Sequence, residues 1–253
     1  MTDKREDRKQ LLENRKMIRK QIASLITGYG FKRRGRSVFC QIIGENAVFF
    51  HIDHPTNTFY LAYGAYPLYM PPMHIHFFCE AMRLSVSMND FAMDLADDAT
   101  KEEVDVWCAK ADAFLRDRLM PFFHQTSSAE GMACCLRAKE KDAEDKEYTP
   151  LGRLSVLTFR PPQEPLMYVE LAAHAFDRAV EAVHACLAEI EARASRRPLN
   201  EAYRRSMEAK TRQVLELAEM ADPQAVDAIL NGWRKQNAAM INHRRRLLPD
   251  EKA

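Results

Sequence analysis

The chain has 253 residues, of which 47% are hydrophobic, 29% charged and 9% aromatic, and its formal net charge is +1. This composition is that of an ordinary globular protein, and it excludes collagen-like, low-complexity and wholly disordered chains. The length allows one large domain or two small ones, and the near-zero net charge indicates no particular class of partner.

Two features of the sequence predict the cellular compartment. The first ten residues, MTDKREDRKQ, lack the apolar stretch of a secretory signal, and no apolar run approaches the roughly 20 residues of a membrane helix. None of the six cysteines is spaced as C-x-x-C, the pattern typical of zinc and redox sites. We therefore expect a cytoplasmic protein with reduced thiols and no membrane partner.

The first predicted element is an amphipathic helix. Apolar residues recur at three- and four-residue steps from Leu11 to Tyr29, with charged residues on the other face. Gly28 and Gly30 are expected to end this helix, and residues 32–36 (KRRGR) follow as a basic turn.

A change of period then predicts strands. Residues 37–43 and 47–53 are rich in β-branched and aromatic residues, and the glycine-containing turn between them predicts a hairpin. Residues 58–66 (TFYLAYGAY) supply a third strand, and residues 73–78 a fourth short one. Together they predict an antiparallel sheet of about four strands.

Beyond residue 100 the periodicity becomes helical. A helix is predicted over residues 102–123, ending near Pro121, and residues 127–130 (SSAE) resemble a capping box that opens the next helix. Residues 139–147 are almost all charged, which indicates an exposed helix end or a linker. Residues 154–159 form an apolar run too short to distinguish a strand from a helix.

Three further helices are predicted in the carboxy-terminal part. One runs from Pro165 to about Ala194, the next opens at Pro198, and the last opens at Asp222-Pro223, an N-cap followed by a proline in the first turn. The predicted fold class is therefore α+β, with an α+β domain at 10–140 and a helical, bundle-like region at 150–248.

The charges are segregated along the chain. Residues 1–36 hold 12 Lys and Arg against 4 Asp and Glu, whereas residues 37–140 hold 7 against 14. The basic helix and the acidic sheet region either pack against each other, or the acidic region forms a surface for a protein partner or the basic segment one for phosphate.

The best candidates for metal ligands are His51, Asp53, His74 and His76. Alternate residues share one face of a strand, and two imidazoles with a carboxylate suit zinc or ferrous iron. This cluster predicts a metal-dependent enzyme as an alternative function. The other interpretation is a set of partly exposed strand histidines without a metal.

A second alternative is nucleic-acid binding through Lys32, Arg33, Arg34 and Arg36, which have aromatic neighbours for base stacking. The sequence contains no phosphate-binding loop, dinucleotide fingerprint or nucleophile elbow. It therefore predicts no catalytic residue and no cofactor.

The order of motifs resembles a known family. A basic G-F-K-R-R-G segment begins at Gly30, a hairpin follows, and the third strand contains Phe59-Tyr60-Leu61. Over roughly residues 10–140 this is similar to the bacterial domain of unknown function 4304 family. That family has no established catalytic residues, and some relatives occur near polymorphic toxin loci as immunity proteins. The resemblance implies an intracellular bacterial protein of this kind.

The leading prediction is a non-enzymatic protein-binding or immunity-like module that occludes its partner through the acidic sheet region. The negative charge of residues 37–140, the missing catalytic motifs and the resemblance all favour it. Self-association stays open.

Overall fold

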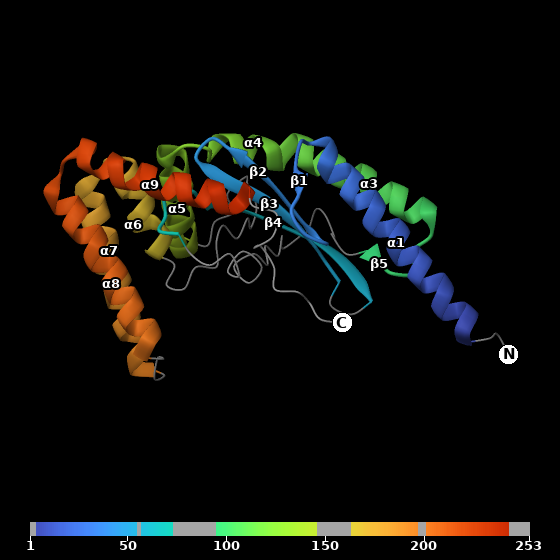
Figure 1. Cartoon of the computed structure of the whole chain (residues 1–253). Helices are drawn as coiled ribbons and strands as arrows, with labels where there is room; N and C mark the ends of the chain where they lie inside the picture. Colours follow the sequence, from blue (N-terminus) through green and yellow to red (C-terminus); the bar gives the residue numbers. More distant parts are fainter. Residues whose placement is uncertain (1–3, 55–56, 73–94, 146–162, 197–200, 243–253) are drawn as a thin grey trace.

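A long helix, α1 (Lys4–Gly28), leads into the sheet in the computed structural model, which describes residues 4–54, 57–72, 95–145, 163–196 and 201–242 (Figure 1). Ile18, Ile22 and Ile26 recur at four-residue steps and are fully buried, which explains the packing of this helix. The helix ends as predicted, because Gly30 has a φ of +87° that glycine adopts without strain.

The sheet has five antiparallel strands in chain order: β1 (Lys32–Arg33), β2 (Val38–Ile43), β3 (Asn46–Asp53), β4 (Thr58–Pro67) and β5 (Leu95–Ala96). The hairpin between β2 and β3 closes through Gly44 and Glu45, and Gly44 has a φ of +57° at the first turn position. This is the glycine pattern of a tight hairpin turn. The α+β class is confirmed, and the predicted strand at 73–78 lies outside the described residues.

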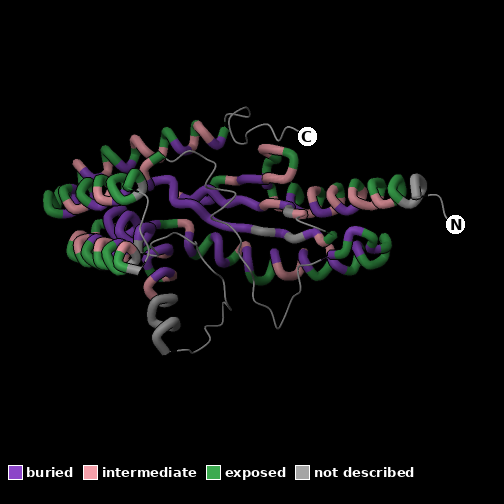
Figure 2. Tube along the Cα trace, turned by 90° about the horizontal axis from the view of Figure 1, so that it is seen from below, coloured by how far each residue is buried: buried purple, intermediate pink, exposed green. Residues whose placement is uncertain are grey.

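Both faces of β3 are covered. The successive residues from Ala47 to Phe50 are each at most 2% exposed, which is typical of a strand buried on both sides (Figure 2). The Phe50 ring packs edge-on against Phe31, with ring centroids 4.8 Å apart, and against Phe123 at 6.3 Å. The basic entry segment and the helices after residue 100 thus share one core with the sheet.

A continuous helical segment follows β5. It comprises α3 (Lys101–Phe114), a π-helical turn η1 (Leu115–Leu119) and α4 (Met120–Gln125). Thr100 and Glu103 form a reciprocal capping box at its start, a signal that the sequence analysis missed. The predicted end near Pro121 is wrong. Because Pro121 lies in the first turn of α4, directly after the π-helical turn, its missing N–H is tolerated.

The next helix, α5 (Ala129–Asp145), begins one residue away from the predicted cap. Ser128 accepts a hydrogen bond of 3.2 Å from the Gly131 N–H, so the third helical position is Gly131 rather than Glu130. The predicted capping box is therefore wrong, although a serine caps the helix. The charged run from residue 139 continues α5 to Asp145, which confirms a helix end there.

The predicted helix from Pro165 to Ala194 is two helices, α6 (Gln163–Ala172) and α7 (Phe176–Arg196). His174 has a φ of +54°, and the Ala175 N–H donates to the Glu170 carbonyl at 3.0 Å. These are features of a Schellman ending, which usually has a glycine at the position of His174. Without a glycine or a proline there, the sequence contains no signal for the break.

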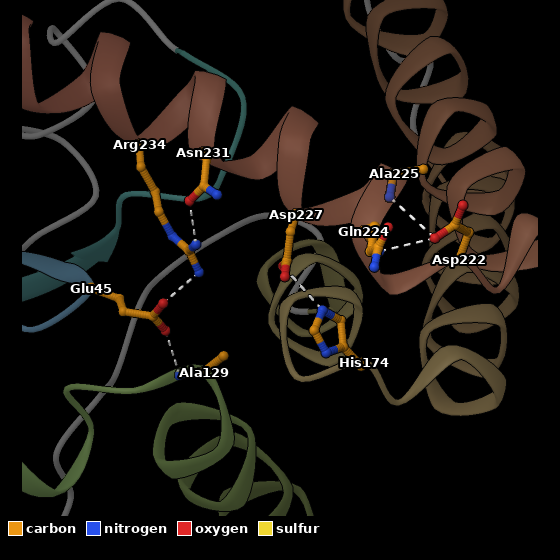
Figure 3. Close-up of polar contacts among 9 residues, drawn as sticks. All are labelled: Glu45, Ala129, His174, Asp222, Gln224, Ala225, Asp227, Asn231 and Arg234. Carbon is orange, nitrogen blue, oxygen red and sulfur yellow. Dashed lines mark hydrogen bonds and ion pairs between the residues drawn. The ribbon is translucent and has the colours of Figure 1, made fainter.

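Two more helices follow in the described part of the chain, α8 (Glu201–Met220) and α9 (Pro223–Asn242). The predicted N-cap of α9 is confirmed, because Asp222 accepts hydrogen bonds from the N–H groups of Gln224 at 2.9 Å and Ala225 at 3.3 Å (Figure 3). The predicted helix start at Pro198 and the apolar run at 154–159 lie outside the described residues.

The last helix returns to the sheet. Asn237 of α9 is buried, and its Nδ2 donates to the carbonyls of Leu68 at 2.7 Å and Met70 at 2.8 Å, just after β4. Arg234 lies over the ring of Tyr69 at 5.5 Å. Among the described helices, none is both long enough and apolar enough to span a bilayer.

Candidate functional site

An open, shallow groove with a mixed polar and apolar lining lies between α1 and α3, which run side by side along the sheet (Figure 1). Its volume is about 500 Å³. The lining combines small, polar and acidic residues, namely Gln21, Ser24, Leu25, Gly28, Tyr29, Asp105, Cys108 and Asp112.

Hydrogen bonds join α1, and Tyr29 directly after it, to α3 across the groove. The amide nitrogen of Gln21 donates to Asp105 Oδ1 at 3.1 Å, and the Tyr29 hydroxyl donates to Asp112 Oδ1 at 2.7 Å. Arg116 forms an ion pair of 3.2 Å with the other oxygen of Asp112. Gln21 Oε1 is buried and accepts no hydrogen bond from any described residue. Gln21 Oε1 therefore lies below the surface of the groove without a donor, and the exposed acceptor of the groove is the Asp105 carboxylate.

The groove contains no activated nucleophile. Burial, together with the hydrogen bond to Asp112, raises the pKa of Tyr29 to about 12. Burial and the nearby Asp105 raise the pKa of Cys108 to about 11. Both groups are protonated at neutral pH, whereas nucleophilic catalysis by cysteine needs the thiolate. This chemistry favours binding over catalysis in the groove.

Most of the described acidic residues of the middle segment lie outside the strands. The five strands contain a single acidic residue, Asp53. The turn before α3 carries two and the helical segment that begins with α3 carries five, namely Asp97, Asp98, Glu102, Glu103, Asp105, Asp112 and Asp117. We therefore locate the acidic surface on α3 rather than on the sheet. One ion pair, between Arg15 and Asp97, joins the basic and acidic segments within the described part of the chain.

That ion pair belongs to a buried cluster at the end of the sheet. Asp97 is 5% exposed and accepts a hydrogen bond of 2.9 Å from Arg15 Nε. His54 Nε2 lies 3.5 Å from Asp97 Oδ2, and its ring centroid lies 4.3 Å from that of Phe59. Burial, and then the charge of Arg15, lower the pKa of His54. The cluster joins α1 to the end of the sheet and lies outside the groove.

Of the four predicted metal ligands, the structure places the side chain of one. His51 Nε2 lies within hydrogen-bond distance of Ser37 Oγ, at 3.1 Å. His74, His76 and the side chain of Asp53 lie outside the described residues. Among the residues that are described, no three His, Cys, Asp or Glu side chains are grouped to hold a metal ion. The metal site stays a prediction.

The four residues of the basic turn that are predicted to bind nucleic acid differ in whether their side chains are free to contact a ligand. Arg33 folds back and donates to the carbonyls of Gly35 at 2.9 Å and Arg36 at 2.6 Å. Arg34 donates to Asn242 Oδ1 of α9 at 3.0 Å. Lys32 and the side chain of Arg36 are exposed. The turn therefore uses two of its four cations in the fold itself.

A second polar cluster joins the hairpin to two helices (Figure 3). Glu45 Oε2 accepts a 2.9 Å hydrogen bond from the Ala129 N–H at the start of α5, and its other oxygen pairs with Arg234 of α9. Nearby, His174 pairs with Asp227 at 3.0 Å. These contacts connect elements of the fold.

The groove is not among the sites that the sequence predicts. Asp105 and Asp112 are seven residues apart, two helical turns, so their shared helix face was readable from spacing. Which helix lies opposite that face depends on the tertiary packing of α1.

Comparison with family models gives no match, and neither curated proteins nor solved structures contain a significant match to this chain. The resemblance to the domain of unknown function 4304 family therefore stays a prediction. The candidate site is defined by its own geometry alone.

Proposed function

We propose that this protein is a non-enzymatic, immunity-like binding module that occludes a protein partner by receiving a basic segment of that partner in the α1–α3 groove. The observation that carries the proposal is the exposed carboxylate of Asp105 in the groove, whose lining also includes Asp112. Carboxylates suit the N–H groups of an arginine or lysine side chain. The protonated thiol and phenol further support binding rather than catalysis.

The proposal places the protein in the cytoplasm of a bacterium, as the resemblance implies. Cys40, Cys108, Cys134, Cys135 and Cys186 are free thiols, which suits a reducing compartment. A metal-dependent enzyme that uses His51, Asp53, His74 and His76 is the rival proposal, and alanine substitutions at these positions would abolish any metal-dependent activity.

The binding experiment compares the wild type with Asp105→Arg. The wild type is first used to capture binding proteins from the organism that carries the gene. A captured protein is then identified, purified and titrated by calorimetry with the wild type and with the variant. We expect Asp105→Arg to weaken binding by at least about tenfold, or roughly 1.4 kcal/mol, because the substitution replaces an acceptor with a cation.

Two further variants sharpen this experiment. Ser24→Arg, at an exposed position in the groove, should also weaken binding, because its side chain fills the site. Glu216→Arg makes the same charge change as Asp105→Arg at an exposed position on α8 and should leave the affinity unchanged. A partner that binds Asp105→Arg and Ser24→Arg as tightly as the wild type would refute the proposal.

A further inference from the structure

The outer side of α1 carries a cationic face that the groove does not use. We define the basic face as Arg8, Lys9, Lys16 and Lys20, all of which are exposed. At 3.6 residues per turn, these positions fall within one side of the helix. Lys16 forms an ion pair with Glu13 at 2.7 Å. Arg8 and Lys20 form no ion pair with an acidic side chain in the described part of the protein, and Lys9 is near enough to Glu13 that its charge, after the hydrogen bond and charge of Lys16, helps to lower the pKa of that carboxyl.

No other described element covers this face. The amino-terminal turns of α1 extend past the end of the sheet in both views (Figures 1 and 2). Farther along the same helix, Arg15 and Arg19 have contacts within the fold, because Arg15 pairs with Asp97 and Arg19 lies over the Phe59 ring at 5.6 Å. The cations of α1 are thus divided between those that hold the helix and those that face outward.

We propose that the basic face binds the phosphate backbone of double-stranded nucleic acid without sequence preference. From Arg8 to Lys20 the helix rises about 18 Å at 1.5 Å per residue. Duplex DNA presents about one negative charge per 1.7 Å of its axis, so several phosphates lie within reach of the face. Lysines act as point charges toward phosphate, and the face carries no asparagine or glutamine side chain that would read a base edge.

The alternatives fit the helix less well. An amphipathic helix binds a membrane by inserting an apolar face, but Ile18, Ile22 and Ile26 of α1 are buried in the protein core. Leu12, at 48% exposure, is the large apolar side chain exposed on this helix. A second copy would offer the α3 surface, where Lys101 and Lys110 interrupt the acidic residues. The continuous anionic charge of a duplex is the better complement.

The test measures anisotropy of a fluorescent DNA duplex of about 20 base pairs between about 50 and 200 mM salt. If Arg8, Lys9 and Lys20 each contact one phosphate, at about −0.9 per contact, the wild type should show a slope of log K against log salt near −3. The triple variant Arg8→Gln, Lys9→Gln, Lys20→Gln should bind at least about tenfold more weakly at the lowest salt, with a slope near zero. Its circular dichroism should match the wild type, because all three positions are exposed.

Matched variants locate the effect. Removing three exposed cations elsewhere, with Lys101→Gln, Lys110→Gln and Lys235→Gln, should leave affinity and slope within twofold of the wild type. Absence of wild-type binding, or an equal loss in this control, would overturn the proposal. So would a loss seen only with Lys32→Gln and Arg36→Gln in the basic turn, or binding to phosphatidylserine vesicles in place of the duplex. The groove is not part of this assay, so this proposal and the proposed function fail separately.

Discussion

The surroundings of His54 oppose a positive charge on its ring. It is packed on Phe59, and Arg15 and Arg19 of α1 contribute repulsion, while Asp97, from the turn after β5, is the opposing attraction. Burial is the largest cause of its lowered pKa, and the charge of Arg15 is next. His54 is therefore neutral at neutral pH, and Asp97 is left to bond with Arg15.

This arrangement predicts acid sensitivity. The folded pKa of His54 lies below its unfolded value of about 6.5, so the unfolded chain binds more protons as the pH falls through that range. The free energy of unfolding contributed by His54 is therefore complete above pH 6.5 and decreases below it. We expect His54→Gln to reduce the loss of stability between pH 7.5 and 5.5, measured by urea unfolding at both values.

The matched control is His124→Gln, which changes an exposed histidine on α4. Its difference in stability between the two pH values should equal that of the wild type. If His54→Gln keeps the full wild-type difference, protonation of His54 does not destabilise the fold.

At the scale of elements, two helical glycines have opposite surroundings. A Cβ on Gly131, in the first turn of α5, would lie 2.1 Å from the carbonyl oxygen of Gln125 at the end of α4. A Cβ on Gly232, inside α9, would meet no atom within 4 Å. The first glycine lets α4 and α5 approach each other, whereas the second provides no such contact.

We therefore expect two alanine substitutions to have opposite signs. Gly131→Ala should lower the free energy of unfolding by about 1–3 kcal/mol, because backbone must move to relieve the contact. Gly232→Ala should raise it by about 0.5–1 kcal/mol, because alanine loses less backbone entropy in a helix. Urea unfolding of the two variants and the wild type measures both effects, and a stabilised Gly131→Ala would contradict the close approach of α4 and α5.

For the whole molecule, the question is whether the sheet and the carboxy-terminal helices unfold together. The sequence predicts two regions, at 10–140 and 150–248. In the structure, Asn237 of α9 donates to two carbonyls after β4, and Arg234 pairs with Glu45 of the hairpin. Buried carbonyls that lose their donors cost about 1–3 kcal/mol each, so these contacts favour one cooperative unit.

The two tryptophans report on the two regions separately. Trp107 lies on α3 and Trp233 on α9, so Trp233→Phe and Trp107→Phe each leave one fluorescent reporter. In each variant, the urea midpoint from fluorescence should coincide with that from circular dichroism, as two-state unfolding requires. Asn237→Leu, added to either variant, should lower both midpoints together, whereas a fluorescence midpoint separated from the dichroism midpoint would show two independent domains.

Local sequence chemistry determined the first helix, the β2–β3 hairpin and the start of α9. Periodic isoleucines, a glycine at the turn and the Asp222-Pro223 pair act over a few residues, so each can be recognised without the rest of the chain. The break at His174 was not predictable in this way, because a non-glycine residue adopts a positive φ there and no neighbouring residue indicates it.

The candidate site was decided by tertiary structure. Gln21 and Asp105 are 84 positions apart, and Glu45 and Arg234 are 189 apart. Composition showed that residues 1–36 are basic and residues 37–140 acidic, but only the packing of α1 beside α3 created the groove and left the basic face outward. Periodicity determines which side of a helix is apolar, whereas the identity of its neighbour depends on contacts between segments distant in the chain.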